Sequence, residues 1–190
     1  MNDDKDEQNT RISKFMALVL RHKPELIGII MNSEGWVNLD DFIRKLNIYK
    51  HFNVNKETVN IIIKNDEKQR YALSSDGSMI RANQGHSVDI NLNLKPEMPP
   101  FILYHGTVHK YLEKIKKEGL RPMSRQFIHL SLDKKTAENV GKRRGIPVVL
   151  TVNARDMYTA GYNFYQSENK IWMTKTIPIE YINFENNKGE

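Results

Sequence analysis

The sequence has no cysteine, no long hydrophobic run and no glycine-rich phosphate loop. The lack of cysteine excludes disulfides, thiolate zinc sites, iron–sulfur clusters and a cysteine nucleophile. No stretch approaches the ~18 apolar residues that span a bilayer, and the polar, acidic N-terminus is unlike a secretory signal. Without a GxGxxG or Walker motif, a Rossmann or P-loop site is not supported. We therefore expect a cytoplasmic protein that has no membrane partner.

Metal ligation has little support either. The six histidines are scattered, and no HExxH motif is present. His105 and His109 are four residues apart, but the Gly-Thr-Val between them does not favour the helix that would place both on one face. We therefore expect no bound metal.

Positive charge is concentrated in one part of the chain. The 190 residues carry a net charge of +6. Residues 104–146 alone hold 11 Lys and Arg against 4 Asp and Glu, whereas residues 1–95 hold 14 against 13. A local basic excess attracts polyanions such as nucleic acid or nucleotides. The alternative is a solvated lysine-rich surface, which is the favoured interpretation for Lys114, Lys116 and Lys117.

The first lobe has the pattern of three helices and a hairpin. Apolar residues at helical spacing predict a helix over residues 11–22, and Asn38 and Asn55 are candidate caps of two further helices. Strand-like residues at 70–73 and 79–82 flank an Asp-Gly turn signal. This order is typical of a winged-helix module that binds RNA, although such modules also serve protein contacts. The first ten residues are predicted to form a loose tail.

A proline-rich segment divides the chain. Residues 94–100 hold three of the seven prolines, which stiffen the backbone and remove amide donors. We place the boundary within residues 88–100 and assign residues 1–92 and 93–190 to two lobes. Short helices are expected at 111–118 and 136–144. Strands are expected at 101–105, 128–131, 147–152, 162–164, 171–174 and 181–184. The result is an α+β protein whose second lobe has a split, curved β core.

Several cations lie beside small polar residues at the ends of the predicted elements, where functional groups tend to sit. Each has a structural alternative. Arg21 could complement the dipole of the first helix, Arg70 could pair with Asp66, and His129 could be a core histidine on a strand. Taken singly, these clusters decide nothing.

Taken together and in order, the local strings resemble the RNA 2′-phosphotransferase family. This family consists of NAD-dependent enzymes that remove the 2′-phosphate left at a ligated splice junction. The resemblance runs over residues 12–182. The matching motifs are LxxxLRH with a following EGW, NDxKQR(F/Y), RAxQGHS, HGT, PMSR, HLS and FYxSxN-apolar-W.

The resemblance implies a winged-helix lobe followed by a lobe with the ADP-ribosyltransferase fold. It also implies a reaction in two steps. The RNA 2′-phosphate first attacks the anomeric carbon of the nicotinamide ribose and expels nicotinamide. The ribose 2″-hydroxyl then attacks the phosphate of this 2′-phospho-ADP-ribosylated RNA, releasing RNA and ADP-ribose 1″,2″-cyclic phosphate.

By motif, the resemblance implies a catalytic set of Arg21, His22, Arg70 and Arg125. The three arginines would hold the 2′-phosphate and stabilise the second transition state, whose charge lies on the equatorial oxygens. For His22, holding the phosphate and moving a proton both remain open. These groups would act without a metal.

The resemblance also assigns the remaining site residues. The NAD-binding residues would be His105, Gly106, Thr107, His129, Leu130, Ser131 and Ile171. Ile171 stands where many protein-modifying ADP-ribosyltransferases have a glutamate, which disfavours activation of a protein side chain. The cleft that holds RNA would be lined by Gln84, Gly85, His86 and Ser87. Arg143 and Arg144 could meet pyrophosphate or RNA backbone, or lie on a plain surface helix.

Three hypotheses follow. The first is the NAD-dependent RNA 2′-phosphotransferase, with tRNA as the substrate if the host ligates tRNA halves by the route that leaves a 2′-phosphate. The second is an ADP-ribosyltransferase acting on terminal phosphates of RNA or DNA, which would share the first step alone. The third is a non-catalytic RNA-binding protein. No apolar patch or heptad pattern demands a dimer, so we expect a monomer.

Overall fold

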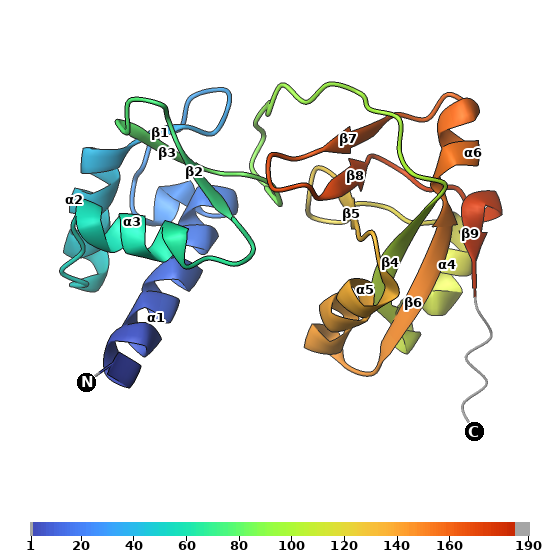
Figure 1. Ribbon diagram of the computed structural model, residues 1–190, viewed down its shortest axis with the longest axis horizontal. Helices are drawn as coiled ribbons and strands as arrows, with labels where there is room; N and C mark the ends of the chain where they lie inside the picture. The colour runs from blue at the N-terminus through green and yellow to red at the C-terminus, as the bar shows by residue number, and fades with distance from the viewer. Residues whose placement is uncertain (1, 185–190) are drawn as a thin grey trace. The chain divides into compact units, whose positions relative to one another are not determined.

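The computed structural model describes residues 2–184, with side chains described from residue 5 onward. The chain divides into two compact units, Met1–Asn93 and Leu94–Glu190. Each unit combines helices with antiparallel strands and has its own hydrophobic core (Figure 1). The expected α+β class is confirmed. Within residues 2–184, no helix is both long enough and apolar enough to cross a membrane.

The first unit packs three helices against a small sheet. Its elements are α1 (Asn2–Arg21), the 3-10 turn η1 (Pro24–Leu26), β1 (Val37–Asn38), α2 (Leu39–Lys50), α3 (Lys56–Lys64), β2 (Tyr71–Leu73) and β3 (Met79–Ala82). The strands form an antiparallel sheet in the order β1-β3-β2. Ile12, Met16, Phe42 and Leu46 are fully buried, so the apolar faces of α1 and α2 form part of this core.

Both predicted helix caps are present. The side chain of Asn38 accepts a hydrogen bond from the amide of Asp41 at 2.9 Å, at the start of α2. Asn55 begins α3 with a capping box, in which its side chain and that of Thr58 each bind the other's backbone amide. These bonds satisfy amides that have no partner within the helix and so fix where α2 and α3 begin.

The predicted loose tail is wrong, because α1 already begins at Asn2. No proline or glycine interrupts residues 2–11. Once the buried residues Ile12, Phe15 and Met16 fix the helix, each preceding residue adds a backbone hydrogen bond without a new nucleation cost. Asp6 and Glu7 add negative charge near the positive end of the helix dipole. Apolar periodicity detects only the half of such a helix that faces a core.

The hairpin is closed by Asp76. Its carboxylate accepts hydrogen bonds from the hydroxyls of Ser74 and Ser78 and from the amide of Ser78, at 2.6, 2.8 and 3.0 Å. These bonds lower the pKa of Asp76 to about 2. Gly77 supplies the positive φ, +68°, that the turn requires. The predicted Asp-Gly turn is therefore confirmed.

The second unit contains two short antiparallel sheets. Its elements are β4 (Ile102–Val108), η2 (His109–Tyr111), α4 (Leu112–Glu118), β5 (Ile128–Leu130), α5 (Lys134–Gly141), η3 (Lys142–Arg144), β6 (Pro147–Asn153), α6 (Ala154–Thr159), β7 (Phe164–Gln166), β8 (Trp172–Thr174), η4 (Ile179–Tyr181) and β9 (Ile182–Asn183). The sheet orders are β4-β6-β9 and β5-β8-β7. A bridge between Tyr104 and Ser131 joins the sheets, with N–O distances of 2.9 and 2.8 Å.

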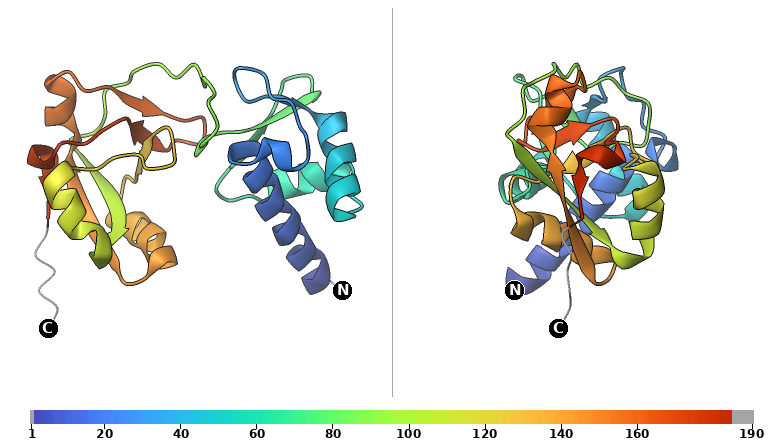
Figure 2. Two further views of the ribbon diagram at one scale, coloured as in Figure 1. Left: turned by 180° about the vertical axis from the view of Figure 1, so that it is seen from behind. Right: turned by 90° about the vertical axis from the view of Figure 1, so that its right-hand side faces the viewer.

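Helices α4 and α5 lie on opposite sides of the β4–β6 pair (Figure 2). Helix α5 packs on β4 at unusually short range. A Cβ atom on Gly106 would lie 1.8 Å from the carbonyl oxygen of Ala137, and one on Gly141 would lie 2.7 Å from that of Thr107. Only glycine fits at either position, so this pair of glycines sets the distance between the helix and the strand.

Candidate functional site

The C-terminal end of α1 is held by the segment that follows β3. Arg21 is the last residue of α1, and its carbonyl oxygen accepts the amide of Ser87 at 2.9 Å. Nδ1 of His22 lies 3.0 Å from Oγ of Ser87. The structure therefore brings the predicted Arg21–His22 pair together with Ser87 from the predicted RNA-cleft set.

Gly85 lies beside the Arg21 guanidinium. Its φ is +90°, a conformation that side-chain-bearing residues rarely adopt. A Cβ atom at this position would lie 3.7 Å from Nη1 of Arg21. Gln84, the residue before it, is partly buried in the same bend. The positive φ thus carries the backbone alongside the guanidinium.

His86 is buried, with 2% of its surface exposed, and neither ring nitrogen has a hydrogen-bond partner within residues 2–184. Burial, and to a lesser extent the nearby charges of Arg21, His22 and Arg81, together lower its pKa to about 3. His86 is therefore neutral at physiological pH, and it adds no charge to the cations around it.

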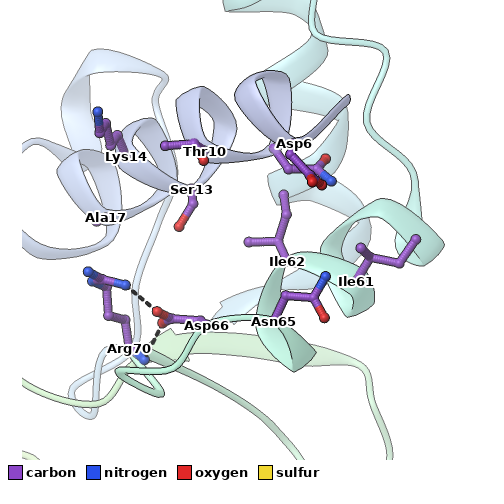
Figure 3. Close-up of a pocket in the computed structure, with 11 residues that line it drawn as sticks. Asp6, Thr10, Ser13, Lys14, Ala17, Ile61, Ile62, Asn65, Asp66 and Arg70 are labelled. Carbon is purple, nitrogen blue, oxygen red and sulfur yellow. Dashed lines mark hydrogen bonds and ion pairs between the residues drawn. The ribbon is translucent and has the colours of Figure 1, made fainter. Parts of the chain in front are cut away.

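Arg70 is fixed by Asp66. The backbone amide of Arg70 donates to Oδ2 of Asp66 at 2.6 Å, and its guanidinium pairs with Oδ1. The Asp66 side chain is 5% exposed, whereas that of Arg70 is 31% exposed. Both line an open hollow of about 530 Å³ between α1 and α3. Figure 3 shows that the Ser13 side chain also points toward it. The pairing that the sequence left as a structural alternative is present, and it leaves part of the guanidinium accessible.

Tyr71 follows Arg70 in the chain and is anchored to Ser13 of α1. Its buried hydroxyl contacts the Ser13 side chain at 3.2 Å and donates to the Ser13 backbone carbonyl. Burial raises the pKa of Tyr71, while the Ser13 hydrogen bond and then the charges of Arg21 and Arg70 oppose that rise. The charges of both arginines therefore influence the Tyr71 hydroxyl, and the first unit contains three of the four predicted catalytic residues, Arg21, His22 and Arg70.

The fourth predicted catalytic residue, Arg125, lies in the second unit beside two histidines of the predicted NAD site. Nη1 of Arg125 is 3.5 Å from Nδ1 of His129. Nδ1 of His105 donates to the backbone carbonyl of His129 at 3.1 Å, which leaves Nε2 of His105 as the acceptor. The two histidines and Arg125 thus form one cluster at the border of β4 and β5.

Two pKa shifts describe the electrostatics of this cluster. Burial lowers the pKa of His105, so its ring is neutral at physiological pH. Arg125 remains accessible to solvent, yet partial desolvation lowers its pKa, and Arg144 and Arg143 lower it further. Positive charge around Arg125 is therefore crowded, and an anion would relieve the repulsion.

The other predicted NAD residues occupy different places. Leu130 is in the hydrophobic core, and Gly106 and Thr107 form the close contact with α5. Ser131 forms the bridge between the two sheets. Ile171 is partly buried and closes a tight turn, with its backbone amide donating to Oγ of Ser167 at 3.1 Å.

Sequence reasoning missed several residues that hold this site. Asp66 was considered only as a reason to discount Arg70, and Ser167 was not assigned a role. Arg81, which lies 4.4 Å above the Trp36 ring and is 8% exposed, was also missed. All three lie within the matching motifs. Their membership of these motifs could therefore have identified them, whereas their residue types alone could not.

The donor set fits a dinucleotide. Neutral imidazoles such as His105 can donate and accept hydrogen bonds with a carboxamide or a ribose, and arginines suit phosphates. The hydroxyl of Ser131 adds a further donor close to His129. Within residues 2–184, no group of three or more histidine or acidic side chains is placed to hold a metal ion.

Comparisons with known proteins agree on one family. The model of the RNA 2′-phosphotransferase, Tpt1/KptA family matches residues 7–176. A protein of Flavobacterium johnsoniae, named probable RNA 2′-phosphotransferase, is 47% identical over 92% of this chain and 95% of its own length. Proteins with the same name from Acaryochloris marina and Fusobacterium nucleatum are each 42% identical, over 93% and 94% of this chain and 97% and 99% of theirs. The chain therefore belongs to the RNA 2′-phosphotransferase family, a family of transferases.

Proposed function

We propose that the protein is an NAD-dependent RNA 2′-phosphotransferase that removes an internal 2′-phosphate, as at a tRNA splice junction. Nicotinamide and ADP-ribose 1″,2″-cyclic phosphate would be the other products. The observation that carries the proposal is the set of fixed basic side chains in the first unit, where Asp66 holds Arg70 and Ser87 holds Arg21 and His22 at the end of α1. A set of this kind suits a compact dianion such as a phosphate monoester.

The first unit supplies the phosphate-binding residues. Arg21 and Arg70 would each present a planar guanidinium that can make two parallel bonds to phosphate oxygens. Both are held before substrate arrives, Arg70 by Asp66 and the Arg21 backbone by Ser87. Preorganised donors stabilise charge that develops on equatorial oxygens without a reorganisation cost. For His22, whose Nδ1 contacts Ser87, Nε2 is the atom that would hold the phosphate or move a proton.

The second unit supplies the residues that would hold NAD. His105, His129 and Ser131 would orient the nicotinamide ribose and carboxamide, with Gly106, Thr107, Leu130 and Ile171 shaping the backbone around them. As co-substrate, NAD supplies the anomeric carbon that takes the phosphate and the 2″-hydroxyl that later removes it from the RNA. Arg125, next to His129 at 3.5 Å, would bind the phosphate at this step.

The arrangement of elements supports the proposed lobes. An antiparallel sheet in the order β1-β3-β2, with β2 and β3 forming a hairpin after three helices, is typical of a winged helix. Two short sheets joined by the bridge between Tyr104 and Ser131 are consistent with the split core of an ADP-ribosyltransferase-like lobe. We propose these folds for the two units.

A short RNA with one internal 2′-phosphate tests the function. Purified protein is mixed with this RNA in EDTA, with and without NAD, and the RNA is followed by gel while nucleotide products are identified by mass spectrometry. The proposal expects loss of the phosphate only with NAD, together with nicotinamide and the cyclic phosphate. The matched RNA without a 2′-phosphate is the control and should consume no NAD.

The other hypotheses predict different products. RNA that stops at the ADP-ribosylated stage, or modification of RNA that carries only a terminal phosphate, would favour the ADP-ribosyltransferase. RNA binding without NAD consumption would favour the third hypothesis, a non-catalytic RNA-binding protein. Arg70→Ala and Arg125→Ala separate the two steps, since either should make ADP-ribosylated RNA accumulate if these arginines act in the second step.

A further inference from the structure

An arginine-bearing turn lies beside the Arg125 cluster. The 3-10 turn η3 (Lys142–Arg144) follows α5 and ends in two arginines. Lys142 pairs with Glu138 at 2.8 Å. Within residues 2–184, neither Arg143 nor Arg144 has a carboxylate partner. Two neighbouring guanidinium groups can thus donate hydrogen bonds to a bound anion.

The turn is anchored to the strand that carries the predicted NAD motif. The glycine pair Gly106 and Gly141 lets α5 touch β4 backbone to backbone. The turn begins directly after Gly141, so there is no flexible segment between the contact and the two arginines. The guanidinium groups are therefore attached to a fixed position beside residues 105–107, although their side chains are exposed.

The charges of these arginines reach the site. Arg144 and Arg143 both lower the pKa of Arg125, and Arg144 also lowers that of His105. Like charges that converge without a neutralising acid raise the energy of the free protein, and this cost is offset when an anion binds.

We propose that Arg143 and Arg144 form a second phosphate-binding site, which holds a phosphate of a substrate other than the 2′-phosphate. The inference rests on the proposed function, because it assumes that NAD and RNA are the substrates. Phosphate groups occur in both, as the pyrophosphate of NAD and as the phosphodiesters that flank the 2′-phosphate. The arginine fork binds either, and the experiment separates the two sources.

The test uses equilibrium binding with the full-length chain. The variant R143Q/R144Q is compared with the unmodified protein for the Kd of NAD by calorimetry and the Kd of a 2′-phosphorylated RNA by fluorescence anisotropy. Loss of charged hydrogen bonds to one phosphate should raise one of these Kd values about tenfold. R143K/R144K keeps the charge and should recover part of the loss.

The double variant K114Q/K117Q is the matched control. It removes the same charge from exposed residues of α4, on the other side of the β4–β6 pair. If this control weakens binding as much as R143Q/R144Q does, net charge explains the effect and the inference is wrong.

Each outcome has a defined meaning. A higher Kd for NAD alone assigns the site to the pyrophosphate. A higher Kd for RNA, with a salt slope shallower by about one or two, assigns it to the RNA backbone. Unchanged values for both overturn the inference. Because binding is measured without turnover, a protein that binds normally but removes no phosphate would contradict the proposed function and not this site.

Discussion

At the scale of single residues, Asp66 decides where Arg70 points. It binds both the backbone amide and the guanidinium of Arg70. D66N keeps the size of the side chain and removes its charge, so we expect kcat to fall about 10- to 100-fold as Arg70 loses its fixed position. The KM for NAD should not change, because the residues proposed to hold NAD belong to the second unit. Steady-state kinetics with 2′-phosphorylated RNA measures both constants.

Asp41 offers the control for Asp66. It pairs with Arg44 and Lys45 on the surface of α2, where ion pairs contribute little. D41N should therefore leave kcat unchanged. Full activity of D66N alongside an inactive R70A would show that Arg70 works without its carboxylate partner.

Gly85 is a second residue with a specific role. Its φ of +90° disfavours any side chain, so G85A should cost about 1 kcal/mol of stability and shift the backbone beside Arg21. Gly77 has a φ of +68° and nothing within 4 Å of its Cβ position. G77A should thus show a similar loss in urea denaturation with normal turnover, whereas G85A should lose turnover as well. Equal turnover in both variants would contradict a role for Gly85 at Arg21.

His86 should make stability depend on pH. Its pKa in the folded protein is about 3, well below the ordinary value of 6.5. Between pH 6.5 and pH 3, the His86 ring is therefore protonated in the unfolded chain but neutral in the folded protein. The contribution of His86 to the free energy of unfolding is complete above pH 6.5. It is lost as the pH falls toward 3, by up to about 1.4 kcal/mol per pH unit.

Urea denaturation at pH 7 and pH 5 tests this linkage. Carried out in a W172F background, the measurement uses Trp36 as a reporter of the first unit. The chain with His86 should lose about 2 kcal/mol more between the two pH values than H86N does. The same loss in both would mean that His86 titrates normally in the folded protein.

Local strings could nominate candidate site residues, but they could not predict the partners of those residues. The motifs selected Arg21, His22 and Arg70, yet nothing in their spacing predicts that the charges of Arg21 and Arg70 both influence the Tyr71 hydroxyl. Such proximity depends on how α1 crosses β2, which is a tertiary property. The motif assigned Leu130 to the NAD site, and the structure shows that its side chain is buried in the core.

At the scale of elements, capping was predictable because it is local. Asn55 is the clearest case, since both halves of its capping box lie within four consecutive residues. N55A should cost about 1 kcal/mol of stability while turnover stays normal, because α3 loses the cap but keeps its packing. Denaturation with urea checks the first expectation and the 2′-phosphorylated RNA assay the second. A loss of turnover would mean that α3 and the hollow beside Arg70 are coupled.

Short elements were the ones that the sequence did not reveal. Strand β1 has two residues and α6 has six, too few for a hydrophobic period to appear. They form because the sheet and core beside them already exist. The N-terminal half of α1 was missed for the opposite reason, since it extends a helix beyond the core that reveals its period.

At the scale of the whole molecule, the proline-rich segment at residues 94–100 opens the second compact unit, which begins at Leu94. Composition could indicate this boundary because three prolines lie there and the excess of basic residues begins shortly after it. The many short strands of the second unit predicted a split β core, but not which strands form each sheet or that the sheets are joined at Tyr104 and Ser131. That division depends on pairings between residues far apart in sequence.

The contact between Gly106 and Gly141 ties together two positions that are distant in the chain. A methyl group at either one pushes α5 away from β4, and the gap that opens would accommodate a methyl group at the other. The cost of the double substitution G106A/G141A should therefore be smaller than the sum of the single costs, a departure from additivity that thermal denaturation of the three variants can measure. Through this epistasis, a descendant that had replaced one glycine would lose less stability at the second replacement than it lost at the first. The two glycines are therefore expected to change as a pair in the course of divergence.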